Sequence, residues 1–118
     1  DPNFKDNVRA IKNKITETPD RFITYFSDES YCIVYKKDLH YEFYYSQDGK
    51  LIYIGKRTGL NFPTTRYKYN FNGDLEVVSL YLNSKESFVF DTKGQLTAHW
   101  INNKCYDLNG KLILKSFD

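Results

Sequence analysis

The sequence lacks several features that would point to a particular class of protein. It contains no methionine, one tryptophan, two cysteines and three prolines among 118 residues. It has no apolar run of about 18 residues, the length of a membrane-spanning helix, so we predict no membrane-spanning segment. Its 17 basic and 15 acidic residues nearly balance. This balance argues against a nucleic acid partner, because nucleic-acid-binding proteins carry a concentrated basic surface.

Signatures of enzymes are missing too. The sequence has no Gly-x-Ser-x-Gly elbow, no glycine-rich phosphate loop and no His-Glu-x-x-His motif. His40 and His99 are the only histidines and lack the short spacing of a metal site. His40 and Glu42 would share a strand face suited to acid–base chemistry, but charged pairs on a solvated face are far more common. We therefore predict a protein that is not an enzyme, with no catalytic residue, metal or cofactor.

The absence of methionine leaves two origins for the chain, removal of a signal peptide or trimming. The first predicts an exported protein in the periplasm, a lumen or the extracellular space. In such a compartment Cys32 and Cys105 could form a disulfide, which would require their Cα atoms to lie within about 7 Å. Two buried thiols are the alternative. Cys32 lies in an apolar segment, which disfavours a reactive thiolate.

What the sequence does contain is a seven-residue pattern that occurs four times, at residues 45–51, 69–75, 90–96 and 106–112. It reads aromatic, Ser/Asn/Asp, any residue, Asp/Asn/Lys, Gly, any residue, Leu. A type I turn prefers Asp, Asn or Ser first, and a following glycine adopts the left-handed conformation of the common three-residue hairpin loop. We predict this structural role for Gly49, Gly73, Gly94 and Gly110.

Alternation of apolar and polar residues predicts strands from Arg21 onward. Consecutive hairpins make an antiparallel meander. Segments such as 51–54 and 77–80 are apolar on both faces, so we expect the sheet to curve strongly or close.

Before the predicted strands, four apolar residues recur at helical spacing and predict an amphipathic helix over residues 3–16. They are Phe4, Val8, Ile11 and Ile15. The expected fold is mainly β (α+β): one domain, residues 1–118. In it, one N-terminal helix flanks a curved antiparallel β-meander of about ten short strands over residues 21–117.

The four copies of the pattern resemble the YD-type repeats of bacterial Rhs-like surface proteins and other hairpin repeats, including MORN-like ones. Tyr106–Leu112 is the best match. The stretch from Glu86 to Lys111 also resembles small exported proteins of cyanobacteria. The first resemblance implies β-hairpin repeats, and neither implies an activity.

The connection after Gly55 interrupts the series of tight turns and is the first candidate binding site. It carries the cations Lys56 and Arg57 and the apolar residues Leu60 and Phe62. Loops held on a rigid sheet are where binding residues concentrate, although Leu60 and Phe62 could instead cover an end of the sheet. This loop predicts a non-enzymatic module that binds a protein partner or assembles with itself.

Aromatic side chains support an alternative function. If the curved sheet encloses a cavity of about 300 Å³ or more, tyrosines lining it would suit a small-ligand or glycan carrier. Most of these side chains could equally form the core. The candidates are Tyr41, Tyr44, Tyr53, Tyr67, Tyr69, Tyr81 and Trp100.

Overall fold

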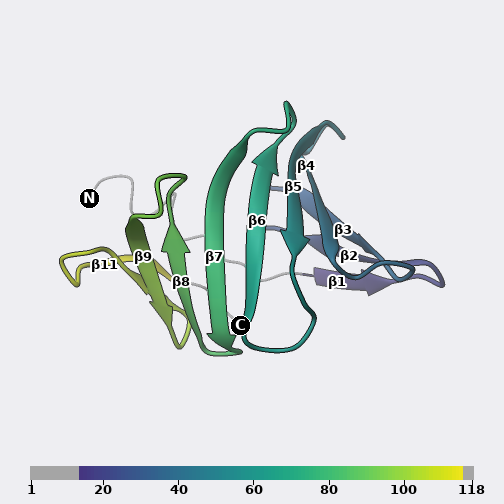
Figure 1. Ribbon diagram of the computed structural model, residues 1–118. Helices are drawn as coiled ribbons and strands as arrows, with labels where there is room; N and C mark the ends of the chain where they lie inside the picture. Colours follow the sequence, from purple (N-terminus) through teal and green to yellow (C-terminus); the bar gives the residue numbers. More distant parts are fainter. Residues whose placement is uncertain (1–13, 116–118) are drawn as a thin grey trace.

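The computed structural model describes residues 14–115, which form one antiparallel sheet of eleven strands without a helix (Figure 1). The strands are β1 (Lys14–Glu17), β2 (Arg21–Tyr25), β3 (Tyr31–Tyr35), β4 (Tyr41–Tyr45), β5 (Leu51–Arg57), β6 (Thr64–Asn70), β7 (Leu75–Asn83), β8 (Glu86–Phe90), β9 (Leu96–Ile101), β10 (Lys104–Tyr106) and β11 (Leu112–Lys115). Each strand pairs with the next one along the chain, so the spatial order is the sequence order. The predicted antiparallel meander is confirmed. The sheet is open, because β1 and β11 do not contact each other.

The predicted helix over residues 3–16 is not supported. Residues 3–13 lie outside the described residues, and the last three predicted positions, residues 14–16, belong to β1 at the edge of the sheet. Ile15 and Thr16 are β-branched and favour an extended backbone. Pairing with β2 places Ile15 opposite Thr24. Ile15 is 64% exposed, so it does not serve as part of an apolar helix stripe packed on the sheet.

The four repeats form hairpin turns of the predicted kind. In each, the glycine N–H donates to the carbonyl three residues earlier at 2.9–3.1 Å, and the glycine has a φ between +79° and +86°. In three copies the Oδ1 atom of the first turn residue, Asn70, Asp91 or Asp107, accepts hydrogen bonds from the backbone N–H groups two and four residues later. A register shift adjoins each turn. The repeat is therefore a device that reverses the chain.

The turn between β2 and β3 has the same geometry without a glycine. The Glu29 N–H donates to the Phe26 carbonyl at 3.0 Å, and the Phe26 N–H donates to the Ser30 carbonyl at 2.9 Å. Glu29 occupies the glycine position with a φ of +67°. A side chain in this region costs about 1–2 kcal/mol. The polar residues 27–30 indicate a turn here, but the seven-residue pattern does not include it because its glycine and its leucine are both absent.

Replacing Glu29 by glycine should stabilise the protein. Glycine removes the left-handed strain but also increases the entropy of the unfolded chain, which costs less free energy than the strain does. We therefore expect the free energy of unfolding to rise by about 0.5–1 kcal/mol. Urea unfolding measures it. Lys93→Gly, at a turn position without a positive φ, is the control and should be neutral or destabilising. A Glu29→Gly protein no more stable than the parent would contradict the assignment.

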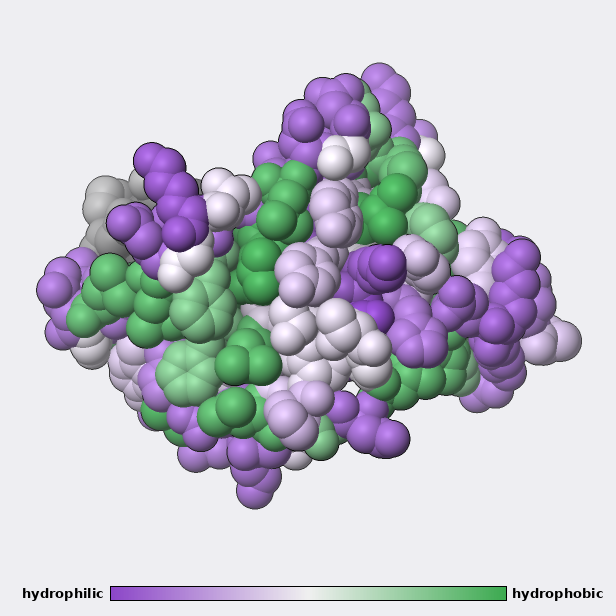
Figure 2. Space-filling view, viewed as in Figure 1, coloured by the Kyte–Doolittle hydropathy of each residue, from purple (hydrophilic) through white to green (hydrophobic). Residues whose placement is uncertain are grey.

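The two faces of the sheet carry different side chains. One face is built from apolar rows such as Ile23, Ile33, Phe43 and Ile54, which lie opposite one another across β2 to β5. The other face carries many of the polar residues. Figure 2 shows one face, on which hydrophobic side chains gather over β7 to β9, with paler and more hydrophilic side chains over β5 and β6.

Candidate functional site

A hollow of about 490 Å³ opens on the face of the sheet that carries polar residues. Strands as distant in the sheet as β2 and β9 both contribute to its lining, through Thr24 and Trp100. Because each strand pairs only with its sequence neighbours, such residues can share one hollow only if the sheet curves around it. The hollow therefore lies on the concave face.

Small residues make up the floor of the hollow. Ser79 on β7 and Ser87 on β8 line it and are only 4% and 8% exposed. Gly55 on β5 lies in register between Glu42 on β4 and Lys68 on β6. A Cβ at Gly55 would lie 2.9 Å from Glu42 Oε1 and 3.5 Å from Arg66 Cδ. The missing side chain thus allows Glu42 and Arg66 to meet across an intervening strand.

Glu42 is held by two arginines. Arg66 Nη1 lies 3.4 Å from Glu42 Oε1, and Arg57 Nη2 lies 3.9 Å from Glu42 Oε2. Arg66 Nη1 also donates to the Tyr44 hydroxyl at 3.1 Å. Both guanidinium carbons lie over the ring of Tyr81, 5.2 Å and 5.4 Å from its centroid. At partly desolvated sites, such cation–π contacts stabilise the positively charged guanidinium groups against the ring.

The guanidinium of Arg66 is not fully satisfied. Its Nε is buried and has no hydrogen-bond partner, which is unusual for a buried polar atom. Burial alone would lower the pKa of Arg66, but Tyr44, Tyr81 and Glu42 outweigh it and raise the pKa above its ordinary value. Burial has the opposite effect on the acid Tyr44 and is the main reason that its pKa is raised. Arg66 therefore stays charged and Tyr44 stays neutral.

Charged side chains of both signs line the hollow. Lys68 Nζ lies 4.2 Å from the ring centroid of Tyr53 and 5.4 Å from that of Tyr44. Among residues 14–115, the charged side chains that line the hollow are those of Arg66, Lys68 and Lys85 and those of Glu42 and Glu86.

The structure separates the four residues of the predicted contact loop. Leu60 and Phe62 are each 49% exposed. Arg57 instead contacts Glu42 on the concave face. Lys56, the preceding residue of β5, lies on the opposite face, where its Nζ is 6.0 Å from the ring centroid of Tyr41. The hypothesis of a contact loop stays a prediction, carried by Leu60 and Phe62.

The predicted aromatic surface is divided between the two faces. Tyr44, Tyr81 and Trp100 line the hollow, and Tyr53 lies beside it under Lys68. Strand alternation places the others on the opposite face, since Tyr67 and Tyr69 lie in register with Lys56 and Ile54, and Tyr41 with Lys56. About half of the tyrosine candidates therefore belong to the hollow.

The two histidines lie in different settings. His40 Nδ1 is 3.0 Å from Asp38 Oδ1 on an exposed part of the surface. Glu42, the acid considered for His40, is engaged by Arg66 and Arg57 instead. His99 Nε2 lies 2.7 Å from Glu86 Oε2, and its ring stacks on Phe88 with centroids 4.3 Å apart. Within residues 14–115, no group of three His, Cys, Asp or Glu side chains is placed to hold a metal ion.

Cys32 and Cys105 are free, buried thiols, so the alternative of a disulfide is not realised. Burial raises the pKa of Cys32 from 9.0 to about 12, and the nearby carboxylate of Glu42 adds to this effect. Burial also raises the pKa of Cys105, to about 11. Neither thiol has the thiolate character that nucleophilic chemistry requires.

The raised thiol pKa values predict a loss of stability in alkali. An acid whose pKa is higher in the folded state stabilises the fold fully below its unfolded pKa, and this contribution falls as pH rises through the folded pKa. For Cys32 the window runs from pH 9.0 to about 12. At about 1.4 kcal/mol per tenfold change in proton affinity, the loss near pH 10.5 should reach about 2 kcal/mol. Urea unfolding at several pH values measures it. Cys32→Ala should show a shallower decline, and equal slopes for the two proteins would refute the prediction.

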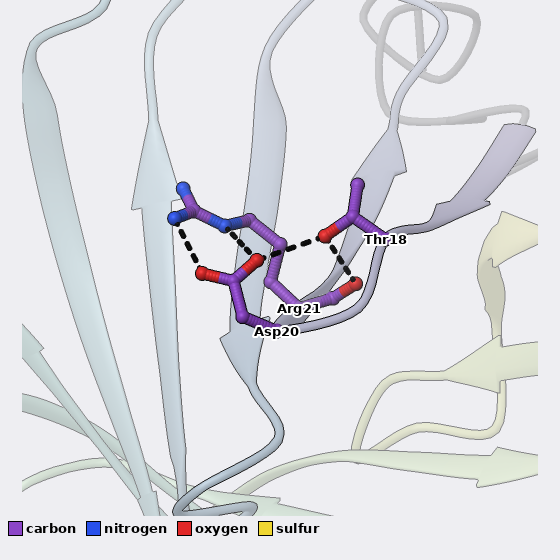
Figure 3. Close-up of polar contacts among 3 residues, drawn as sticks. All are labelled: Thr18, Asp20 and Arg21. Carbon is purple, nitrogen blue, oxygen red and sulfur yellow. Dashed lines mark hydrogen bonds and ion pairs between the residues drawn. The ribbon is translucent and has the colours of Figure 1, made fainter.

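A second depression, of about 580 Å³, lies at the ends of β2 and β3 around Tyr35. Figure 3 shows that the Asp20 carboxylate there accepts hydrogen bonds from the Thr18 hydroxyl and from Nε and Nη2 of Arg21. These bonds, chiefly from Arg21, lower the pKa of Asp20 to about 2. Lys36, in turn, pairs with Glu17. Arg21 and Lys36 are thus paired with carboxylates, so this depression has fewer charged groups available to bind a ligand than the concave hollow.

Comparison with known proteins gave no match: no family model, no curated protein and no solved structure is significantly similar to this chain. No helix among residues 14–115 is long and apolar enough to cross a membrane.

Sequence reasoning missed the polar half of the hollow. Arg66 and Lys68 alternate with Tyr67 and Tyr69, a pattern that also describes a solvated strand face. The signal that could have found them is Gly55, because a glycine within a strand often marks a close approach of other groups.

Proposed function

We propose that this protein is a non-enzymatic carrier that binds a small organic ligand in the concave hollow. The observation that carries the proposal is the hollow itself, about 490 Å³ in volume and lined by side chains from seven strands. This volume is within the range of small-molecule sites. Such sites combine aromatic walls with a few polar groups that fix orientation. Here the walls include Tyr44, Tyr81 and Trp100, and the polar groups are Arg66 and Lys68.

A screen of neutral, anionic and cationic compounds by thermal shift tests this function. The matched variants are Ser79→Leu, which places a larger side chain in the hollow, and Val78→Leu, which enlarges the neighbouring residue on the opposite face of β7. Compounds that raise the melting temperature of the parent should do so for Val78→Leu but not for Ser79→Leu. Ser87→Leu serves the same purpose if Ser79→Leu does not fold. Hits that stabilise all three proteins equally, or no hits in any class, would refute the carrier function.

A second candidate function is the binding of a protein partner, or of a second copy of the chain, through the loop between β5 and β6. The exposure of two large apolar side chains in that loop, Leu60 and Phe62, favours it. The double variant Leu60→Ser/Phe62→Ser should abolish self-association or partner capture. Phe71→Ser is the control, because Phe71 is 69% exposed in a different turn. If Phe71→Ser reduced self-association or partner capture as much as the double variant does, this candidate function would be wrong.

A further inference from the structure

One end of the sheet differs from the other in exposing apolar side chains beside lysines. In an antiparallel meander every second connection lies at the same end of the sheet. The β5–β6, β7–β8 and β9–β10 connections, residues 58–63, 84–85 and 102–103, therefore share the end opposite the four repeat turns. We call this the non-repeat end. Its properties concern what the protein contacts, a question that goes beyond the proposed carrier function.

The β5–β6 loop is tied to its own base and presents two large apolar side chains. The hydroxyl of Thr64, a buried residue, donates to the Gly59 carbonyl at 2.6 Å and accepts from the Gly59 N–H at 3.1 Å. Leu60 and Phe62, between these two residues, nevertheless remain exposed. A loop that is already ordered loses little conformational entropy when it makes a contact.

Two further apolar side chains lie at the non-repeat end. Leu82, near the end of β7, and Ile101, the last residue of β9, are both exposed. The pairing of Thr64 with Tyr81 brings Leu82 beside the β5–β6 loop, and Figure 1 shows the β5–β6 and β7–β8 connections next to each other at the bottom of the sheet. Exposed apolar side chains that gather in one place mark a contact surface.

Lysines accompany these apolar side chains. Lys104, the first residue of β10, lies directly opposite Lys115 on β11. Like charges directly opposite each other in a sheet destabilise it, and an anionic surface would offset this repulsion. Lys85 is exposed in the β7–β8 turn, and the carboxylate that follows it, Glu86, is paired with His99. The non-repeat end therefore combines apolar contact groups with cations suited to an anionic partner.

We propose that the non-repeat end docks on the surface of an anionic lipid bilayer. Leu60, Phe62 and Leu82 enter the boundary between headgroups and acyl chains, and Lys85 and Lys104 contact the anionic headgroups. A specific protein interface involves about 20–30 residues on each side, far more than the few exposed apolar side chains here. Binding to a bilayer instead depends on apolar area and on attraction to anionic lipids, and it needs no partner of matching shape.

The concave hollow reaches the same end of the sheet, since Asn83, Ser84 and Lys85 belong to its lining. Docking in this orientation places the hollow beside the lipid surface. Ser79 lies nearer the middle of β7, so Ser79→Leu should bind vesicles as the parent protein does. Docking and the carrier function can therefore fail independently.

Cosedimentation with lipid vesicles tests the proposal. Vesicles of phosphatidylcholine and phosphatidylserine should bind the protein at least about tenfold more tightly than vesicles of phosphatidylcholine alone, because each lysine near an anionic surface contributes about fivefold in affinity. The preference should shrink in high salt.

Two double variants separate the two ends of the sheet. Leu60→Ser/Phe62→Ser should weaken binding to the anionic vesicles at least about tenfold. Phe71→Ser/Leu108→Ser is the matched control and should bind as the parent does, because Phe71 and Leu108 are even more exposed but lie in repeat turns at the other end.

Two lysine variants test the electrostatic part. Lys104→Gln should weaken binding to the anionic vesicles about fivefold and leave any binding to phosphatidylcholine unchanged. Lys93→Gln, which removes an exposed lysine from a repeat turn, should change neither.

The opposite results would overturn the proposal. They are absence of binding to anionic vesicles, equal binding to both kinds of vesicle, or an equal loss in Leu60→Ser/Phe62→Ser and Phe71→Ser/Leu108→Ser. Self-association in solution that requires Leu60 and Phe62, without vesicle binding, would also overturn it and would assign the non-repeat end to a second copy of the chain. Analytical ultracentrifugation of the same variants detects that outcome.

Discussion

Replacing Glu42 by alanine should lower the free energy of unfolding by about 2–3 kcal/mol. Glu42 is 15% exposed and balances Arg66 and Arg57, which are 21% and 27% exposed at their side chains. Removal of one partner from a buried ion pair costs about 3–5 kcal/mol, because the remaining charge is left desolvated. The partial exposure of these arginines reduces that figure through solvent screening.

Urea unfolding at neutral pH measures the effect of Glu42→Ala. Glu76→Ala is the control: Glu76 is exposed on β7 and accepts one long hydrogen bond, from the Asn70 amide at 3.5 Å, so we expect a change below about 0.5 kcal/mol. The double variant Glu42→Leu/Arg66→Leu should recover much of the loss, since it removes both members of the closer pair. A loss for Glu42→Ala no larger than that for Glu76→Ala would show that the ion pair does not hold β4 against β6.

Replacing Gly94 by valine should destabilise the protein by at least about 1–2 kcal/mol. Gly94 has a φ of +79°, and no atom lies within 4 Å of where its Cβ would be. The cost is therefore backbone strain and not a clash. It falls on a turn in which the Gly94 N–H donates to the Asp91 carbonyl at 3.1 Å. A β-branched residue adopts the left-handed region least readily.

Gly94→Asn separates conformational strain from the simple loss of glycine. Asparagine tolerates the left-handed region, so this variant should lose clearly less stability than Gly94→Val. Thermal melting and urea unfolding both report the difference. If the two variants were equally stable, the type I turn with a left-handed glycine would be the wrong account of this repeat.

The hairpins could be predicted from the sequence because their determinants are local. A turn needs Asp91 at one end and Gly94 at the other, within four residues, and both are visible in the chain. The polar segment at residues 27–30 also predicts a turn between two strands, but the left-handed conformation of Glu29 could not be predicted because no glycine marks it. Short turns bring consecutive strands together, so the antiparallel meander could be predicted from the turns.

The end of the predicted helix, residues 14–16, is a strand for a different reason. Apolar residues at helical spacing describe a local preference, and strand pairing with β2 overrides it for residues 14–16. Such pairing depends on residues up to Tyr25, beyond the window in which a period is judged.

The hollow could be predicted only in its aromatic half. The sequence shows that Tyr44 and Tyr81 are available, but not which face they share. The contact between Glu42 and Arg66 joins β4 to β6 over Gly55, and it depends on the register of three strands and on their curvature. No pattern in a single stretch of chain contains that information.

Trp100 offers the most direct test of the central claim, that the concave face is the ligand site. It is the only tryptophan in the chain and it lines the hollow, so its fluorescence reports on this place alone. Titration with a compound that stabilises the parent protein in the thermal-shift screen should change the Trp100 emission saturably. The change should persist in Val78→Leu and be lost in Ser79→Leu. Unchanged Trp100 emission in the parent protein at a saturating concentration of the compound, or a change that survives in Ser79→Leu, would contradict the account.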